Sequence, residues 1–161
     1  MASRVLFVCL GNICRSPTAE GVMRRLVAES EHEGEVVVDS AGTAGWHEGD
    51  PPDRRSQYEA KERGTDISGL RGRQVALHDF ERFDLLLAMD TDNQRDLLRL
   101  APDDAARGKV RLLREFDPEA VASGDLEVPD PYYGGPSGFA AVLAMIKAAV
   151  PGLVDWVHAQ R

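Results

Sequence analysis

The chain has 161 residues, which suits one domain over residues 1–161 with a full core and is short for two. Its hydrophobic and charged fractions, 43% and 29%, are those of an ordinary soluble protein. The formal net charge of −8 argues against nucleic acid as a partner, so an anionic substrate would need local positive potential.

The N-terminal part of the chain predicts a strand, a tight loop, a helix and a second strand. Residues 4–9 are nearly all apolar, which is typical of a strand buried on both faces of a parallel sheet. We expect a helix over Thr18–Glu29, with Ser16 as a possible cap and Pro17 in the first turn. The β-branched run at 35–40 predicts the second strand.

The middle of the chain continues the alternation of strands and helices. A Gly- and Pro-rich loop is expected over residues 41–52. A polar helix should follow over Asp53–Arg63 and stop at Gly64. Residues 83–89 predict a third buried strand, and a helix should then run to about Leu100.

The C-terminal part predicts a weaker strand over Val110–Leu113 and a long acidic loop over residues 114–136. The last helix should begin at Ser137, and Pro151 should kink or restart it. Strands that alternate with helices predict an α/β fold, a single domain with a four-stranded, parallel, twisted sheet and helices on both faces. The loop between the first strand and the first helix would be its phosphate-binding loop.

The cysteines and histidines limit the kinds of site that the chain can hold. The only cysteines are Cys9 and Cys14, so a disulfide framework is not expected. The four histidines, at positions 32, 47, 78 and 158, are scattered, and we expect no metal site. We find no signal peptide and no apolar stretch long enough to span a membrane, so we expect a cytoplasmic protein without a membrane partner. Export without a signal peptide stays open.

The chemistry is expected in the loop that runs from Cys9 to Ser16. The N-terminus of a helix binds anions because its first N–H groups lack partners, and the fork of Arg15 matches two phosphoryl oxygens. Both features favour the thiolate of Cys9, which is the nucleophilic form. Gly11 would let the loop curl around an anion. The other loop residues are Leu10, Asn12, Ile13 and Cys14. The pattern predicts a cysteine-dependent phosphatase, and no Walker motif supports a nucleotide site.

Three segments, Cys9–Pro17, Asp39–Thr43 and Asp130–Gly134, closely resemble the low-molecular-weight protein tyrosine phosphatases and occur in that family's order. The resemblance implies a phosphocysteine intermediate on Cys9, with Arg15 binding the phosphoryl group. It implies that Asp130 protonates the leaving phenol and then activates water. It also implies a hydrolase that acts in signalling and needs no cofactor.

The same resemblance implies roles for residues outside the loop. In the family, residues that match Asn12 and Ser40 hold the phosphate loop by hydrogen bonds, and a residue that matches Asp90 is structural. A histidine often joins that network, but this chain has Leu70 there, so the sequence leaves that support undecided. The residues that resemble the walls of the family's cleft are Trp46, Tyr132, Tyr133 and Leu10.

The sequence leaves several functions open. The implied substrates are tyrosine-phosphorylated proteins or aryl phosphates, with inorganic phosphate, vanadate or similar oxyanions as inhibitors. A protein-arginine phosphatase is the first alternative, although Ile13 in place of a threonine and the tyrosine pair favour phosphotyrosine. A non-catalytic phosphate-binding or redox-sensing module would be expected to lose Cys9, Arg15 or Asp130. A thioredoxin-coupled arsenate reductase would need more cysteines. The resemblance also implies that Cys14 can form a disulfide with the nucleophile under oxidation.

Overall fold

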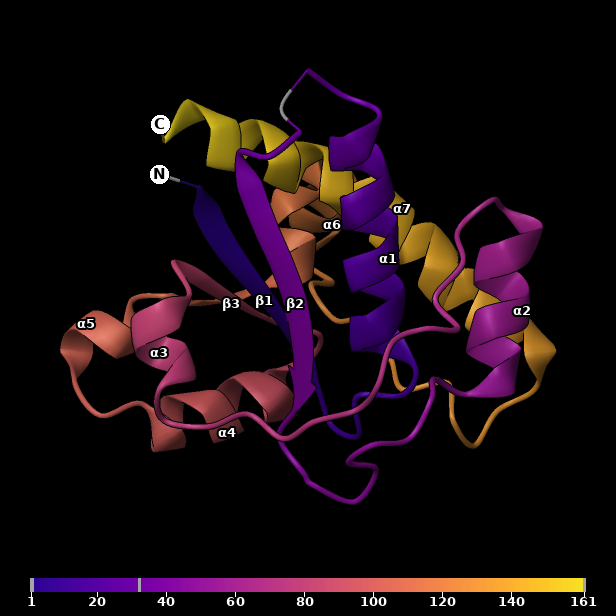
Figure 1. Ribbon diagram of the computed structural model, residues 1–161, viewed down its shortest axis with the longest axis horizontal. Coiled ribbons are helices and arrows are strands. Elements are labelled where there is room, and N and C mark those ends of the chain that lie inside the picture. Colours follow the sequence, from indigo (N-terminus) through magenta and orange to yellow (C-terminus); the bar gives the residue numbers. More distant parts are fainter. Residues whose placement is uncertain (1, 32, 161) are drawn as a thin grey trace.

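The computed structural model describes residues 2–31 and 33–160, and Met1, His32 and Arg161 lie outside the described residues. Four parallel strands form one sheet in the order β2-β1-β3-β4 (Figure 1), which confirms the predicted α/β fold. The strands are β1 (Ser3–Cys9), β2 (Val36–Gly42), β3 (Leu85–Ala88) and β4 (Val110–Leu112). All the strands therefore point their carboxyl ends to one edge, where ligands bind in sheets of this kind.

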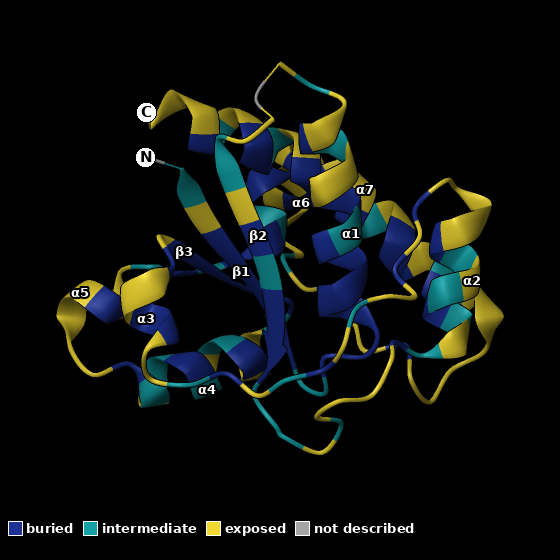
Figure 2. Cartoon of the chain, in the orientation of Figure 1, coloured by how far each residue is buried: buried dark blue, intermediate teal, exposed yellow. Residues whose placement is uncertain are grey.

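Helices cover both faces of the sheet. Val5 and Phe7 of β1 lie in one core with α1 (Arg15–Ala28) and α7 (Pro136–Ala159). Leu6 and Val8 point the other way, into a core with α3 (Asp79–Arg82), α4 (Thr91–Leu100) and α5 (Asp104–Arg107). Figure 2 shows that the buried residues gather in the strands and on the inward sides of these helices. Burial on both faces explains why β1 and β3 are apolar runs without alternation.

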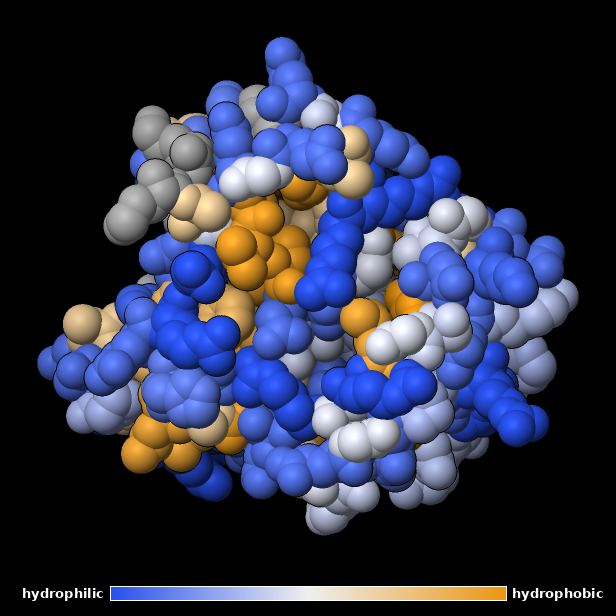
Figure 3. Space-filling model, in the orientation of Figure 1, coloured by the Kyte–Doolittle hydropathy of each residue, from blue (hydrophilic) through white to orange (hydrophobic). Residues whose placement is uncertain are grey.

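The strand β2 forms one edge of the sheet, and its outer side is partly open. Val37 is exposed, and Figure 3 shows apolar side chains along the N-terminal half of this strand, flanked by hydrophilic ones. A side chain of α1 covers part of the edge, because Arg24 Nη2 donates to the Val38 carbonyl at 2.8 Å. A charged residue placed there protects the edge from pairing with another strand.

Two aspartates lie just before helices and cap them. The sequence predicts that a helix begins at Asp53, but the structure places this residue in the cap position, and it gives Asp90 the same role. The Asp53 carboxylate accepts the N–H of Arg55 at 2.8 Å and begins α2 (Arg54–Glu62). Asp90 accepts the N–H of Asn93 at 2.8 Å and begins α4. Gly64, with a φ of 87°, follows the end of α2. Each cap satisfies helix-end groups that would otherwise lack partners.

The start of α1 differs from the sequence prediction. The helix begins at Arg15 and not at Thr18, and Cys14 occupies the cap position without a side-chain hydrogen bond. The expectation that Ser16 caps the helix is therefore wrong. Ser16 lies inside the first turn, which leaves its hydroxyl free to contact the residues of the preceding loop.

Residues 114–136 are not one long loop, as the sequence analysis expected. The segment holds part of a short 3-10 helix, η1 (Leu113–Phe116), and the helix α6 (Pro118–Ser123). Asp117 accepts the N–H of Glu119 at 3.0 Å, Pro118 opens the helix and Gly124 ends it with a φ of 82°. These cap signals were present in the sequence, so the remaining loop covers only residues 124–135.

Of the two outcomes expected at Pro151, a kink or a restart, the restart is wrong, because α7 runs without a break through this proline. Proline removes the N–H that would bond the carbonyl of Lys147, four residues earlier. Both Pro151 and Lys147 lie on the exposed side of the helix, where water can reach that carbonyl. The helix therefore tolerates the proline because the lost hydrogen bond is not buried.

By length and composition alone, α7 is long and apolar enough to cross a membrane, which the sequence analysis did not expect. Its apolar side chains, among them Leu143, Ile146 and Leu153, lie in the core that it shares with β1 and α1. This is how the central helix of a folded domain behaves, so the helix carries no argument for a membrane. The cytoplasmic location stays a prediction.

Candidate active site

The loop of residues 9–16 joins the end of β1 to the start of α1, at the carboxyl edge of the sheet. Among the residues described, Asn12 is the one non-glycine residue with a positive φ, at 57°. Asn12 and not Gly11 therefore makes the left-handed turn that curls the loop. The turn points the N–H of Asn12 back toward Cys9, whose Sγ accepts it at 3.3 Å.

Cys9 is the last residue of β1, and its side chain is buried. Besides the N–H of Asn12, its sulfur contacts the Oγ of Ser16 at 3.0 Å. Hydrogen-bond donors around a sulfur stabilise its anion more than its neutral thiol. The surroundings of Cys9 therefore suit a nucleophilic thiolate.

Arg15 is 2% exposed, and several groups hold its guanidinium. Nη1 donates to Asp90 Oδ2 at 2.6 Å and to the carbonyl of Val128 at 2.9 Å. Burial by itself would lower the pKa of Arg15, but Cys9, Asp90 and Asp130 outweigh it and raise the pKa. The guanidinium therefore stays charged, and Asp90 fixes the direction of its fork. The resemblance implies only a structural role for Asp90, and its contact with Arg15 is visible only in the structure.

Asp130 lies in the loop that leads to α7, near a different terminal nitrogen of Arg15 from the one that Asp90 contacts. Its Oδ2 is 3.7 Å from Arg15 Nη2, and its Oδ1 accepts the N–H of Tyr132 at 3.1 Å. The side chain of Asp130 is 37% exposed, so water can reach it. A carboxyl group in this place can exchange protons with a bound molecule and with solvent.

One hollow in the surface brings together most of the residues that the sequence analysis singled out. It is lined by Cys9, Leu10, Gly11, Ile13, Cys14, Arg15, Trp46, His47, Asp130, Tyr132 and Tyr133. Its outer walls, Trp46 and Tyr133, are 73% and 93% exposed, which leaves their rings available to a ligand. Tyr132 packs edge-on against Tyr133 and lies 5.4 Å from the guanidinium of Arg55. The hollow is therefore charged at its floor and aromatic at its rim.

His47 lines the same hollow, and the sequence analysis counted it only among scattered histidines. Its Nδ1 lies 3.1 Å from Asp50 Oδ2. A Cβ added to Gly11 would come within 3.1 Å of the His47 ring, so glycine at this position makes room for His47. His47 lies inside the Gly- and Pro-rich loop of residues 41–52. Its place in that loop, which follows a strand, is the one sequence signal that could have indicated a role in the site.

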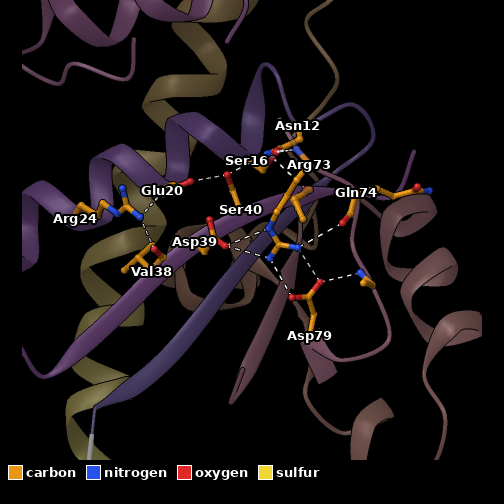
Figure 4. Close-up of polar contacts among 12 residues, drawn as sticks. Asn12, Ser16, Glu20, Arg24, Val38, Asp39, Ser40, Arg73, Gln74 and Asp79 are labelled. Carbon is orange, nitrogen blue, oxygen red and sulfur yellow. Dashed lines mark hydrogen bonds and ion pairs between the residues drawn. The ribbon is translucent and has the colours of Figure 1, made fainter. Parts of the chain in front are cut away.

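A second set of hydrogen bonds holds the loop from behind (Figure 4). Asn12 Nδ2 donates to Ser16 Oγ at 2.7 Å and to Ser40 Oγ at 3.0 Å. The hydroxyl of Ser40 donates to Glu20 Oε1 at 2.6 Å. Burial raises the pKa of Glu20, and the bond from Ser40 and the charge of Arg24 oppose that shift. Ser40 therefore donates to the carboxylate of Glu20, a residue that the sequence did not indicate. Leu70 takes no part in these hydrogen bonds.

The side chain of Cys14 lies in a small apolar cluster with Ile13 and Phe139. Burial raises the pKa of its thiol to about 12, and the charge of Asp53 adds to the effect. Cys14 is therefore a neutral thiol at physiological pH. Cys9 and Cys14 are both free cysteines in the structure.

A metal site would need several ligating side chains close together, and the structure describes residues 2–31 and 33–160. Within these ranges, no three histidine, cysteine, aspartate or glutamate side chains are grouped so that they could hold a metal ion.

Comparisons with known proteins identify the family of the chain. Residues 4–161 match the family model described as low molecular weight phosphotyrosine protein phosphatase. The low molecular weight protein-tyrosine-phosphatase of Streptomyces coelicolor is 49% identical over 160 residues, which are 99% of this chain and 96% of that protein. The low molecular weight phosphotyrosine protein phosphatase of Homo sapiens is 45% identical over 155 residues, or 96% and 95% of the two chains.

A solved structure extends the likeness to three dimensions. The crystal structure of a protein tyrosine phosphatase from Entamoeba histolytica, with Hepes in its active site, superimposes with a TM-score of 0.92. It is 37% identical in sequence and covers 99% of this chain and 99% of that chain. The likeness therefore includes the sheet, both helical layers and all the segments that line the hollow.

Proposed function

This chain belongs to the low molecular weight phosphotyrosine protein phosphatase family, and we propose that Cys9, Arg15 and Asp130 carry out its reaction. It is a protein tyrosine phosphatase and therefore a hydrolase of phosphoric monoesters. One observation carries the assignment of the residues: the nucleophile, the cation and the acid line the same hollow. The roles of the loop residues and of Ser40 rest on the contacts that surround this hollow.

In the first step the phosphoryl group occupies the loop, and Arg15 binds two of its oxygens. The Cys9 thiolate attacks phosphorus and forms an S–P bond as the P–O bond to the phenol breaks. Asp130 gives its proton to the departing oxygen, so a neutral phenol leaves. The hydroxyl of Ser16, 3.0 Å from the sulfur, stabilises the thiolate before attack.

In the second step water releases the phosphate from the enzyme. Asp130, now a carboxylate, takes a proton from a water molecule whose oxygen attacks the phosphorus of phosphocysteine. The S–P bond breaks, inorganic phosphate leaves, and Cys9 returns as a thiolate. Because phosphate binds in the same loop, phosphate and vanadate should compete with the substrate.

The rim of the hollow supports phosphotyrosine as the substrate. Trp46, Tyr132 and Tyr133 offer aromatic surface to a phenyl ring whose phosphoryl group lies on the floor beside Cys9. Phosphoserine has a shorter side chain and no ring to fill this rim. We therefore propose tyrosine-phosphorylated proteins as the substrate class, ahead of phosphoarginine proteins.

A comparison of rates on three matched peptides tests this substrate class. We expect kcat/KM for a phosphotyrosine peptide to exceed those for the phosphoarginine and phosphoserine peptides by about 100-fold or more, because only the first fills the aromatic rim. Hydrolysis of p-nitrophenyl phosphate, and its inhibition by vanadate, would show that the preparation is active. A higher kcat/KM on the phosphoarginine peptide would contradict the proposed substrate and leave the roles of Cys9 and Arg15 in place.

Reversible oxidation is a second property that we propose for this site. Peroxide oxidises the Cys9 thiolate to a sulfenic acid and is itself reduced to water or an alcohol. The Cys14 sulfur then attacks the sulfenic sulfur, a disulfide forms, and the hydroxyl leaves as water. Because the pKa of Cys14 is about 12, little of it is thiolate at neutral pH, and the disulfide should form slowly.

Replacing Cys14 with serine should remove the recovery of activity after peroxide treatment. In the unaltered protein, dithiothreitol should restore most of the activity that a short exposure to peroxide removes, because the disulfide prevents further oxidation. The measurement is the restored fraction of the activity that each untreated protein shows. Equal recovery in the C14S variant would contradict a protective disulfide.

A further inference from the structure

Glu20 is a buried carboxylate that the proposed reaction does not use. It lies on α1 behind the phosphate loop and is 2% exposed. One oxygen accepts the hydroxyl of Ser40 at 2.6 Å, and the other lies 2.7 Å from Arg24 Nη2 (Figure 4). Carboxylates are rarely buried unless they are paired, because burial removes their hydration. A carboxylate kept in this place needs an explanation.

The contacts of Ser40 give the hydrogen bonds a direction. A serine hydroxyl has one proton, and Ser40 donates it to Glu20, so its lone pairs accept the amide of Asn12. The Ser40–Glu20 distance of 2.6 Å is that of a charge-assisted hydrogen bond. Such a bond polarises the hydroxyl of Ser40 and so strengthens the hydrogen bond that this hydroxyl accepts from Asn12. Glu20 therefore makes Ser40 a better acceptor for Asn12.

Asn12 transmits this support to the nucleophile. Its amide is held at both ends, because Oδ1 accepts the N–H of Arg73 at 3.0 Å while Nδ2 contacts Ser40 and Ser16. These anchors stabilise the left-handed backbone that points the N–H of Asn12 at Cys9 Sγ. Asn12 donates to Ser16 Oγ, so the hydroxyl of Ser16 is the acceptor in that bond. Its own proton is therefore free to point at the sulfur of Cys9. Its other acceptor, the carbonyl of Ala41, lies farther away, at 3.5 Å.

We propose that Glu20 is a positioning residue that acts through Ser40 and Asn12 to keep two hydrogen-bond donors directed at the sulfur of Cys9. The inference rests on the proposed role of Cys9 as the nucleophile. Leu70 lines a neighbouring surface hollow with Gly21 and Arg24, and its side chain has no polar group to offer Ser40. In this chain the carboxylate of Glu20 is thus the acceptor at which the bonds from Asn12 and Ser40 end.

The test is the pH at which Cys9 becomes reactive toward iodoacetamide, an uncharged reagent, in the Glu20→Gln variant. The amide is a weaker acceptor, so we expect the reactivity midpoint to move to higher pH and alkylation at about pH 6 to slow by roughly three- to tenfold. Peptide mapping would separate the reaction of Cys9 from that of Cys14. At saturating pH, the rate should approach that of the unaltered protein.

The direction of the shift separates positioning from simple charge. The charged groups that act on Glu20 are Arg24 on its own helix, Asp39 on β2 and Arg73 in the loop after α2. Removing a negative charge from this group would by itself favour the Cys9 thiolate and move the midpoint to lower pH. A shift to lower pH, or no shift, would therefore overturn the proposal.

Two further variants control the experiment. Glu29→Gln removes another carboxylate of the α1 region, which pairs with Arg25 at 2.9 Å, but Glu29 is exposed and should leave the midpoint unchanged. Ser40→Ala should by itself raise the midpoint, and adding Glu20→Gln to it should change little more. A full additional shift in the double variant would mean that Glu20 does not act through Ser40. If Glu20→Gln does not fold, an unchanged midpoint in Ser40→Ala would still overturn the proposal, because Glu20 is proposed to act through Ser40.

Failure of this inference can be told apart from failure of the proposed function. If turnover of an aryl phosphate requires Cys9 but the midpoint does not move in Glu20→Gln, only the role of Glu20 is wrong. If turnover survives replacement of Cys9, the proposed function is wrong whatever the midpoint does.

Discussion

Replacing Cys9 with serine should reduce turnover of an aryl phosphate by about 10⁴-fold or more, because the reaction loses its nucleophile. A serine hydroxyl is not ionised at neutral pH. The contacts of Cys9 Sγ, to the N–H of Asn12 and to Ser16 Oγ, can stabilise an anion but would not remove a proton from a hydroxyl. The measurement is the steady-state rate on p-nitrophenyl phosphate, with a search for phosphorylated protein after rapid quenching.

The Cys9→Ser variant should keep its fold and its anion site. Oxygen is smaller than sulfur and fits the same buried space, so the melting temperature should change little. Binding of phosphate should persist, since the C9S change leaves Arg15 and the backbone of the loop in place. A variant that folds and binds phosphate but keeps more than about one hundredth of the activity would contradict a phosphocysteine mechanism.

Replacing Asp130 with asparagine should lower kcat on a phosphotyrosine peptide by roughly 10²–10⁴-fold, the usual contribution of a general acid. Asparagine keeps an oxygen for the N–H of Tyr132, which Asp130 accepts at 3.1 Å, so the turn should remain. The loss should be smaller on p-nitrophenyl phosphate, because nitrophenolate is a stable anion that leaves without a proton. The measurement is therefore the ratio of the two losses.

The matched control for Asp130 is Asp125→Asn in the same loop. Asp125 is exposed and lies 3.4 Å from Arg114, away from the hollow, so its replacement should change kcat by less than about twofold. Phosphate should bind to the D130N variant at least as tightly as to the unaltered protein, because a carboxylate 3.7 Å from Arg15 has been removed. Equal losses of kcat on both substrates would contradict a role in protonating the leaving group.

Arg15 supplies the local positive charge with which an acidic chain can bind an anion, although two carboxylates lie beside it. The net charge of −8 repels phosphate over long distances, so the attraction must be local. Asp90 contacts Arg15 Nη1 at 2.6 Å and is 19% exposed, whereas Asp130 is nearer to Nη2 and 37% exposed. We infer that Asp90 holds the guanidinium in place while Nη2 stays available to a phosphoryl group.

The errors of the sequence analysis have local causes. In residues 114–136 the acidic composition predicts a loop, whereas Asp117 and Pro118 begin α6 and Gly124 ends it. The restart expected at Pro151 depended on the missing N–H alone, whereas in the structure both Pro151 and Lys147 are exposed residues of α7. In both cases the hydrogen-bond partners of the backbone groups determine where the helix begins, ends or continues. The composition of a segment does not describe these partners.

By itself the sequence determined the four strands, most of the long helices and the motif. Apolar runs predicted β1 and β3, the spacing of Cys9 and Arg15 around a helix start predicted the anion site, and the resemblance implied the acid Asp130. These signals are local, because strand and helix periodicity and loop chemistry extend over only a few residues. Such local signals can be recognised in a segment without knowing where that segment lies in the fold.

Only the tertiary structure decided which partners meet at the site. Arg15 bonds to Asp90 and to the carbonyl of Val128, which lie 75 and 113 positions away in the sequence. Glu20 reaches Ser40 only because α1 packs against β2. Such contacts depend on the order of the strands and on the packing of the helices, and no pattern of neighbouring residues encodes them. The support of the phosphate loop, unlike its chemistry, is therefore a property of the fold.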